Sequence, residues 1–224
     1  MANDYFQFKR FTVRQSRSAM KVGTDGTLLG AWARGGQRIL DIGTGTGLIA
    51  LMMAQRYPSA YVVGVEIDDE SCGQASENVS SSEFSDRISV VCCDIRQIRL
   101  EPFDAIVCNP PFFVDSLECP DSHRTQARHA SSLSYKELFS AVSVMLVADG
   151  VFSAVIPSQC KRAFESEAYL AGFFMHRECA VKTTALKPAK RYLLEFGRKS
   201  APLEATEGVI GSEWYDCLTK DFYL

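Results

Sequence analysis

Short apolar runs alternate with amphipathic stretches along most of the chain. The runs typical of strands lie at residues 38–42, 61–65, 88–92, 103–108, 151–156, 173–181 and 192–196. Stretches with helical periodicity lie among them, at residues 48–56, 68–79, 135–147 and 158–170. Alternation of this kind is typical of crossover helices and a mostly parallel sheet. The pattern therefore predicts an α/β fold.

Three segments lie outside this alternation. A leader, residues 1–37, opens with aromatic residues at alternating positions, and a polar loop at 111–134 is longer than most connections between elements. A tail, residues 198–224, ends in the apolar cluster Phe222–Leu224, which we expect to dock on the core. We predict one domain made of all 224 residues, with its core at 38–197.

Composition excludes several classes of protein. Hydrophobic residues make up 46% of the chain and charged residues 23%, as in an ordinary globular protein. No apolar run reaches the roughly 18 residues of a membrane helix, and the first residues do not resemble a signal peptide. The cysteines form no CxxC pair and the histidines are scattered, so no metal site is predicted. We therefore predict a cytoplasmic protein. The net charge of −3, taken alone, argues against a nucleic-acid partner.

A glycine-rich loop, DIGTGTG, follows the first predicted strand and opens a predicted helix. It contains Asp41, Gly43, Gly45 and Gly47. Glycines allow backbone amides to approach a ligand closely, and ligands bind at the carboxyl ends of strands in open parallel sheets. Glu66 closes the next strand, where its carboxylate could accept both hydroxyls of a ribose.

The spacing of the loop indicates the kind of ligand. It is GxGxG rather than the dinucleotide pattern GxGxxG, and a carboxylate at Asp41 would repel a pyrophosphate but attract an ammonium or sulfonium group. S-adenosylmethionine carries both of these cations, a ribose and an adenine. Asp94, which ends the third strand, would lie near the adenine. The alternatives are a tight turn without a ligand and, for Asp94, a helix N-cap or a solvated acid.

A second motif, Asn109-Pro110-Pro111-Phe112, follows the fourth strand and so lies at the same edge of the sheet. The prolines stiffen the turn and fix the directions of the Asn109 side chain and the Pro110 carbonyl, which are both hydrogen-bond acceptors. Phe112 adds a flat apolar surface. Two acceptors beside an aromatic plane suit a planar exocyclic amine, as on a nucleobase. The alternative is a rigid turn with a phenylalanine in the core.

Taken together, these motifs resemble those of class I S-adenosylmethionine-dependent methyltransferases, over roughly residues 38–197. The resemblance implies a Rossmann-like fold: a seven-stranded, mostly parallel sheet with helices on both faces and an antiparallel last strand. It also implies that DIGTGTG is the cofactor loop, that Glu66 binds the ribose, that Asp94 contacts the adenine, and that NPPF is the signature of amino methylation.

The leader extends the resemblance. FTVRQSRSAMKVGTDGTLLGAWA at residues 11–33, together with the later KPAKRYLLEF, is similar to the bacterial family of tRNA1(Val) adenine-37 N(6)-methyltransferases. This implies that Thr24 and Asp25 lie over the methionine end of the cofactor. It further implies that Asn109, Pro110 and Phe112 hold an adenine of the tRNA anticodon loop for methyl transfer.

Acidic and basic residues are concentrated in different segments of the chain. The net charge of −3 therefore no longer argues against a nucleic-acid partner. Residues 66–104 contain ten acidic residues and three arginines, whereas residues 5–23, 123–136 and 182–199 are predominantly basic. If the basic segments converge near the cofactor, they form a surface for RNA phosphates. The candidate contacts are Arg14, Arg124, Arg128, Lys187, Lys190 and Arg191. The alternative is ordinary solvated surface charge.

Two other functions are compatible with these residues. The first is methylation of a ribosomal-RNA guanine or of a small amine, and the second is a cofactor-binding RNA module without catalysis. An intact NPPF argues against the second. The oligomeric state cannot be inferred from the sequence.

Overall fold

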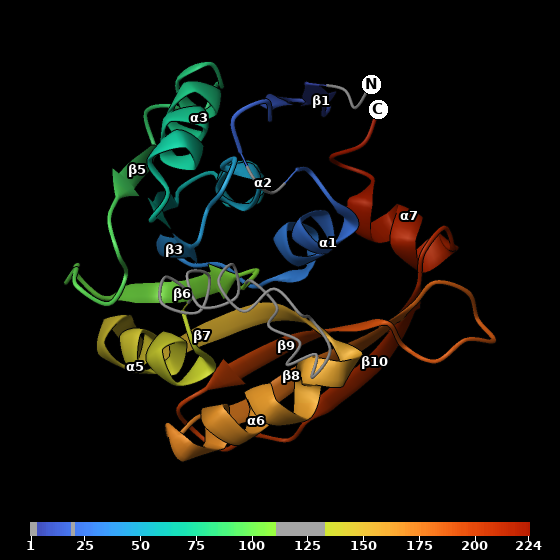
Figure 1. Cartoon of the computed structure of the whole chain (residues 1–224). Helices are drawn as coiled ribbons and strands as arrows, with labels where there is room; N and C mark the ends of the chain where they lie inside the picture. The colour runs from blue at the N-terminus through green and yellow to red at the C-terminus, as the bar shows by residue number, and fades with distance from the viewer. Residues whose placement is uncertain (1–3, 19–20, 111–132) are drawn as a thin grey trace, which may run out of the picture.

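An eight-stranded sheet crosses the molecule, and helices cover both of its faces (Figure 1). The computed structural model describes residues 4–18, 21–110 and 133–224. The strand order is β10-β8-β9-β7-β6-β3-β4-β5. These strands are β3 (Arg38–Ile42), β4 (Tyr61–Glu66), β5 (Ile88–Cys92), β6 (Phe103–Cys108), β7 (Leu146–Pro157), β8 (Phe174–Lys182), β9 (Arg191–Gly197) and β10 (Glu204–Val209).

The helices form two layers, one on each face of the sheet (Figure 1). Among the described residues, α1 (Thr24–Trp32), α2 (Leu48–Arg56), α3 (Asp69–Ser80) and α7 (Glu213–Thr219) lie on one face. The other face carries α5 (Tyr135–Met145) and α6 (Lys161–Leu170), the latter preceded by a 3₁₀ turn at Ser158–Cys160. Each layer encloses its own cluster of buried apolar side chains. This arrangement confirms the predicted α/β class.

The sheet has the predicted seven strands and one more. β9 is antiparallel to both of its neighbours, β7 and β8, as the resemblance implied for the last strand. The additional strand, β10, comes from the tail and pairs parallel to β8. Its sequence, EATEGV, has no alternation of apolar and polar residues, and four of its six residues are exposed. Hydrogen bonds between backbones hold β10 at the edge of the sheet. A strand held in this way need not show a hydrophobic pattern in its sequence.

Leader and tail pack against each other. The antiparallel pair β1 (Tyr5–Gln7) and β2 (Thr12–Arg14) buries Phe8, Phe11 and Val13. The Lys9 amide donates to the Phe222 carbonyl at 2.8 Å, and the Phe222 side chain is only 2% exposed. The prediction that the tail docks on the core is therefore confirmed for Phe222.

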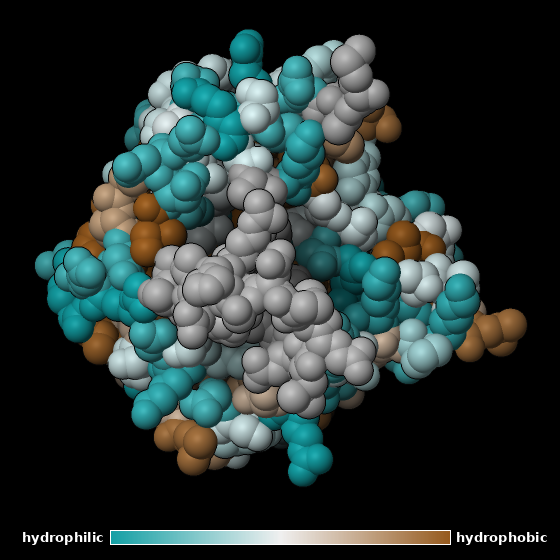
Figure 2. Space-filling model, viewed as in Figure 1, coloured by the Kyte–Doolittle hydropathy of each residue, from teal (hydrophilic) through white to brown (hydrophobic). Residues whose placement is uncertain are grey.

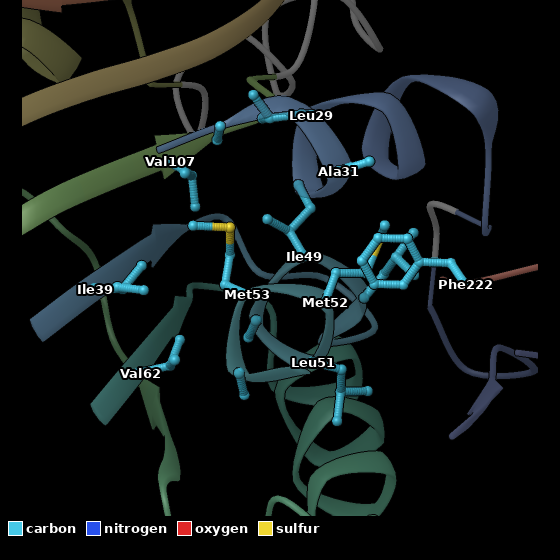
Figure 3. Packing of buried hydrophobic residues seen from close by; sticks show 14 of the residues in the cluster. Leu29, Ala31, Ile39, Ile49, Leu51, Met52, Met53, Val62, Val107 and Phe222 are labelled. Carbon is cyan, nitrogen blue, oxygen red and sulfur yellow. The ribbon is translucent and has the colours of Figure 1, made fainter. Parts of the chain in front are cut away.

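Helix α2 lies at the centre of the larger apolar cluster, and every residue from Leu48 to Ala54 is buried. Figure 3 shows Met53 among Ile39, Val62 and Val107 of the sheet, with Phe222 beside Met52. Helix α1 approaches this layer closely at Gly30.

A Cβ atom at Gly30 would lie 2.7 Å from the Met52 Sδ atom, so a larger residue there would force the Met52 side chain to shift. The packing of α2 fixes where the helix begins, directly after the glycine-rich loop.

Asn78 of α3 joins the leader to that loop. Its side chain is 1% exposed. Its Oδ1 atom accepts from the Arg14 amide at 2.9 Å, and its Nδ2 atom donates to the carbonyls of Arg14 and Thr46, both at 2.8 Å. One buried amide thus holds strand β2 and the glycine-rich loop in fixed positions relative to α3.

Hydrophobic side chains on the face seen in Figure 2 form small separate patches among hydrophilic ones. Within the ranges that the structure describes, no helix has both the length and the apolar character needed to cross a membrane.

Replacing Asn78 tests its structural role. We expect Asn78→Ala to lower the free energy of unfolding by about 2 kcal/mol, because the buried carbonyl of Thr46 and the partly buried amide and carbonyl of Arg14 lose their partner. Urea denaturation measures this difference. The control is Ser80→Ala on the exposed side of the same helix. An equal, small effect of both substitutions would contradict the role.

Candidate active site

A cavity of about 540 Å³ opens at the carboxyl ends of β3, β4, β5 and β6. This volume is in the range typical of small-molecule sites, and the position is where open parallel sheets bind ligands. Residues of the glycine-rich loop, of the turns after β4, β5 and β6, of the first turn of α1 and of the start of β9 line it. The strand ends therefore bring both sequence motifs to one cavity.

The glycine-rich loop has a left-handed backbone at each of its glycines. Gly43, Gly45 and Gly47 have φ values of 70°, 58° and 81°. A Cβ atom at Gly43 would meet no atom within 4 Å, so this residue faces open space, whereas Gly47 packs against Ala75 of α3. Gly43 and Gly45 line the cavity, and Gly47 lies behind it.

Asp41 lies beneath the loop rather than in the cavity lining. Its side chain is fully buried. Its Oδ2 atom accepts from the Thr44 hydroxyl at 2.6 Å and from the Ala50 amide at 3.1 Å. The Oδ1 atom is buried without a hydrogen-bond partner in the described part of the chain. The carboxylate thus ties the loop to the first turn of α2.

Burial raises the pKa of Asp41 to about 7. The bonds from Thr44 and Ala50 oppose this rise, and the charge of Glu66 adds to it. A cation in the cavity would favour the ionised form of Asp41.

Glu66 lines the cavity at the end of β4. Its Oε2 atom accepts from the Gly45 amide at 2.8 Å, and its Oε1 atom accepts from the amides of Ile67 and Asp68 at 2.9 and 3.0 Å. These three donors fix the carboxylate in one orientation. Its remaining lone pairs are available to two hydroxyl groups, as on a ribose. Asp68 also caps α3 by accepting from the Ser71 amide.

Asp94 lines the cavity after β5 and is held by a cation that the sequence interpretation did not include. Arg96 donates from Nη2 to Asp94 Oδ2 at 2.6 Å and from Nε to both oxygens at 2.9 Å. These bonds lower the pKa of Asp94. Arg96 also binds Glu137 at 3.0 Å. The spacing Asp-x-Arg was the available signal for this pair.

Thr24 and Asp25 of α1 line the cavity together with Arg191, the first residue of β9. Asp25 and Arg191 form an ion pair between Oδ1 and Nη1, and burial lowers the pKa of Arg191. Arg191 was predicted as an RNA contact, and its side chain is only 13% exposed. The structure places it inside the cavity.

Asn109 follows β6 and lines the cavity, while Pro110 beside it is buried. The Asn109 Oδ1 atom is buried and makes no hydrogen bond within the described residues. Phe112, Arg124 and Arg128 lie outside the residues that the structure describes.

The remaining predicted RNA contacts lie on the surface. Arg14, Lys187 and Lys190 are exposed and do not line the cavity. Lys187 and Lys190 belong to the β8–β9 connection, which leads into the cavity at Arg191.

Two supporting residues escaped the sequence interpretation. Asn78 bonds the loop carbonyl of Thr46, and Gly64 of β4 allows Thr44 to approach. A Cβ atom at Gly64 would lie 2.9 Å from the Thr44 hydroxyl oxygen. A glycine inside an apolar strand was the signal for such a close approach.

The donor set fits S-adenosylmethionine. The carboxylates of Asp25, Glu66, Asp68 and Asp94 line the cavity together with the basic side chains of Lys21, Arg96 and Arg191, so the site offers groups of both charges to a ligand that carries both. The anchored Glu66 carboxylate suits a ribose, and the open surface at Gly43 admits a ligand close to the backbone.

The raised pKa of Asp41 predicts a dependence of stability on pH. The unfolded chain releases this proton near pH 3.8, but the folded chain keeps it until about pH 7. Stability from this group therefore falls as pH rises through that window. Asp41→Asn keeps the acceptor for Thr44 and removes the charge, so between pH 5 and pH 8 its stability relative to the parent should rise by about 2 kcal/mol.

Urea denaturation of the ligand-free protein at each pH checks this expectation. Asp149→Asn, at a position with a 78% exposed side chain, is the matched control. A stability difference between Asp41→Asn and the parent that stays constant with pH would refute the burial argument.

Comparisons with known proteins agree with the cavity and the fold. Residues 17–185 match the family model described as methyltransferase small domain. The chain is 45% identical over its full length, and over 99% of the relative, to a tRNA1(Val) (adenine(37)-N6)-methyltransferase of Bacteroides fragilis. It is 46% identical, with the same coverage, to a protein of that name from Bacteroides thetaiotaomicron.

A solved structure, described as a predicted O-methyltransferase from Agrobacterium tumefaciens, superposes with a TM-score of 0.67. The match covers 88% of this chain and 96% of the other at 20% identity, so it supports the fold alone. The family model covers most of the chain, and the relatives match it from end to end. The chain therefore belongs to the methyltransferase small domain family.

Proposed function

We propose that this chain transfers the methyl group of S-adenosylmethionine to the N6 amino group of an adenine in tRNA, at position 37 of the tRNA1(Val) anticodon loop. The observation that carries the proposal is the Asn109 Oδ1 atom, a buried acceptor that lines the cavity and has no partner among the described residues. The names of the full-length relatives supply the substrate and the position.

The chain's own residues account for cofactor binding. Glu66 would accept the ribose hydroxyls and Asp94 would contact the adenine, and the backbone at Gly43–Gly45 would form the adjoining wall. When bound, S-adenosylmethionine supplies an electrophilic methyl group on a sulfonium.

Asn109 acts on the acceptor base. The amino nitrogen of adenine is a poor nucleophile because its lone pair is delocalised into the ring. Hydrogen bonds from its two N–H groups to Asn109 Oδ1 and to the Pro110 carbonyl hold the nitrogen toward the methyl group. They also stabilise the positive charge that develops on the nitrogen as its bond to the methyl carbon forms and the sulfur–methyl bond breaks. The thioether is the leaving group, and the methylated nitrogen then releases one proton. Phe112 would stack on the base. Because both acceptors are fixed by the protein, alignment is a large part of the catalysis.

The acceptor base must leave its stack to reach Asn109. Unstacking costs least in a single-stranded loop, which favours an anticodon loop over a duplex.

Replacing Asn109 tests the assignment. Asn109→Ala should lower methyl transfer at least about 100-fold, because one of the two aligned acceptors is lost. The dissociation constant for S-adenosylhomocysteine should change by less than about twofold. Transfer of tritium from labelled cofactor into separated tRNA and rRNA, followed by nucleoside analysis, measures the first effect, and calorimetry measures the second.

The control is Asn109→Asp, which keeps an acceptor at the same position and should keep more activity than the alanine variant. Near-normal transfer by Asn109→Ala would refute the assignment. Label in rRNA guanine rather than tRNA adenine would refute the substrate.

Salt dependence tests the predicted RNA surface. Lys187 and Lys190 are exposed, and neither forms an ion pair among the described residues. Their replacement by glutamine should lower the slope of log affinity for tRNA against log salt by roughly 0.7 to 0.9 for each lysine removed. Filter binding at several salt concentrations measures the slope.

Lys220→Gln serves as the control, because Lys220 is exposed and lies outside the three basic stretches. An unchanged slope in the Lys187→Gln/Lys190→Gln variant would exclude these lysines from the RNA surface.

A further inference from the structure

A partly buried ion pair in the cavity joins Asp25, which the resemblance places over the methionine end of the cofactor, to Arg191, which has no part in the proposed function. Asp25 comes from the first turn of α1 and Arg191 from the start of β9, and both line the cavity. The Arg191 side chain is 13% exposed and the Asp25 side chain 29% exposed. Arg191 Nε is buried and has no hydrogen-bond partner in the described part of the chain. Because buried donors are normally hydrogen-bonded, the free Nε–H of Arg191 indicates that an acceptor group of a ligand binds there.

The order of the strands sets the direction in which the cofactor must lie. Along the sheet, the end of β5 carries Asp94, the end of β4 carries Glu66, and β3 leads into Gly43. Beyond β3 come β6 with Asn109 and, further on, β9 with Arg191. S-adenosylmethionine is a linear molecule with the adenine at one end, the ribose next, then the sulfonium and finally an α-amino acid.

With the ribose at Glu66 and the transferred methyl group facing Asn109, the amino acid end extends away from Asp94. It then reaches the wall formed by α1 and β9. That end carries an ammonium and a carboxylate. Asp25 and Arg191 present the complementary charges side by side.

Other cations of the cavity are less suited to the carboxylate. The basic side chains in its described lining are Lys21, Arg96 and Arg191. Arg96 is already bound to Asp94 and Glu137, and Lys21 is exposed. Arg191 alone among them is largely buried with a free donor, and a guanidinium can bind a carboxylate through two parallel hydrogen bonds.

We propose that Asp25 and Arg191 form the receptor for the zwitterionic α-amino acid end of the cofactor, with Arg191 binding the carboxylate and Asp25 the ammonium. This inference rests on the proposed use of S-adenosylmethionine. It assigns Arg191 to cofactor selection instead of to RNA phosphates.

Two ligands that differ only at that end test the receptor. S-adenosylhomocysteine carries the amino acid, whereas 5′-methylthioadenosine has a methyl group in its place. Arg191→Gln should weaken binding of the first by about 30-fold or more and change binding of the second by less than about twofold, both measured by calorimetry. Arg191→Lys keeps the cation and should lose less than about tenfold.

A double variant shows whether a loss of binding in Arg191→Gln comes only from misfolding. Arg191→Gln alone leaves Asp25 without its cation, so Asp25→Asn/Arg191→Gln removes both charges together. It should bind 5′-methylthioadenosine like the parent and S-adenosylhomocysteine weakly. Arg162→Gln, an exposed arginine of α6 outside the cavity lining, is the matched control and should change neither affinity.

Decarboxylated S-adenosylmethionine separates the two charges. It keeps the ammonium but lacks the carboxylate, so its affinity should fall in Asp25→Asn and stay within about twofold in Arg191→Gln.

Two outcomes would overturn the proposal. Equal weakening of S-adenosylhomocysteine and 5′-methylthioadenosine by Arg191→Gln would show a purely structural ion pair. Unchanged binding of both would exclude Arg191 from the cofactor site. In either case, methylation of tRNA by the parent protein would still support the proposed function. Failure of the parent to bind S-adenosylhomocysteine at all would instead refute that function.

Discussion

Three successive amides of the glycine-rich loop donate to the end of β4, and the architecture of the site depends on these bonds. The amides of Gly43 and Thr44 bond the Val65 carbonyl at 2.9 and 3.1 Å, and the Gly45 amide bonds the Glu66 carboxylate at 2.8 Å. The loop can turn back in this way because its glycines adopt positive φ. The same turn delivers the chain into α2, whose apolar side chains fill the space between α1 and the sheet (Figure 3). The turn of the glycine-rich loop thus determines both one wall of the cavity and the position of α2 in the hydrophobic core.

The main strands could be predicted from sequence because burial on both faces imposes apolar runs, as in Val62–Val65 or Ala105–Cys108. β10 could not be predicted, since it lies at an edge and is held mainly by backbone pairing. A salt bridge between Lys182 and Glu207 at 2.6 Å adds to this pairing. Hydrophobic patterning reports burial, and most of this strand is exposed. The rule that parallel strands end at the same edge was enough to bring Gly43, Glu66 and Asn109 together.

The ion-pair partners of the charged residues could not be predicted from the sequence, because they depend on how distant segments pack together. Arg191 lies in a basic stretch of the chain but pairs with Asp25, and Glu195 four residues later shows the same effect. The Glu195 carboxylate is fully buried between Arg177 at 2.9 Å and Arg34 at 3.2 Å, and Arg177 lies over the Trp32 ring at 4.1 Å. Glu195 of β9 thus pairs with Arg34, which directly follows α1, and with Arg177 of β8, so these pairs hold the end of α1 against the sheet. A count of charge along the chain carries no information about such pairings.

The packing of the leader on the tail has a consequence for the order of events during synthesis. Phe8 stacks on Tyr223, and the Lys9 amide bonds the Phe222 carbonyl, so the first strands contact residues that the ribosome makes more than two hundred positions later. Until those residues emerge, the apolar side chains of the leader have an incomplete surface to bury against. The nascent chain can therefore bury this aromatic segment completely only after residues 222 and 223 have been made, and hydrophobic surface left exposed until then promotes aggregation.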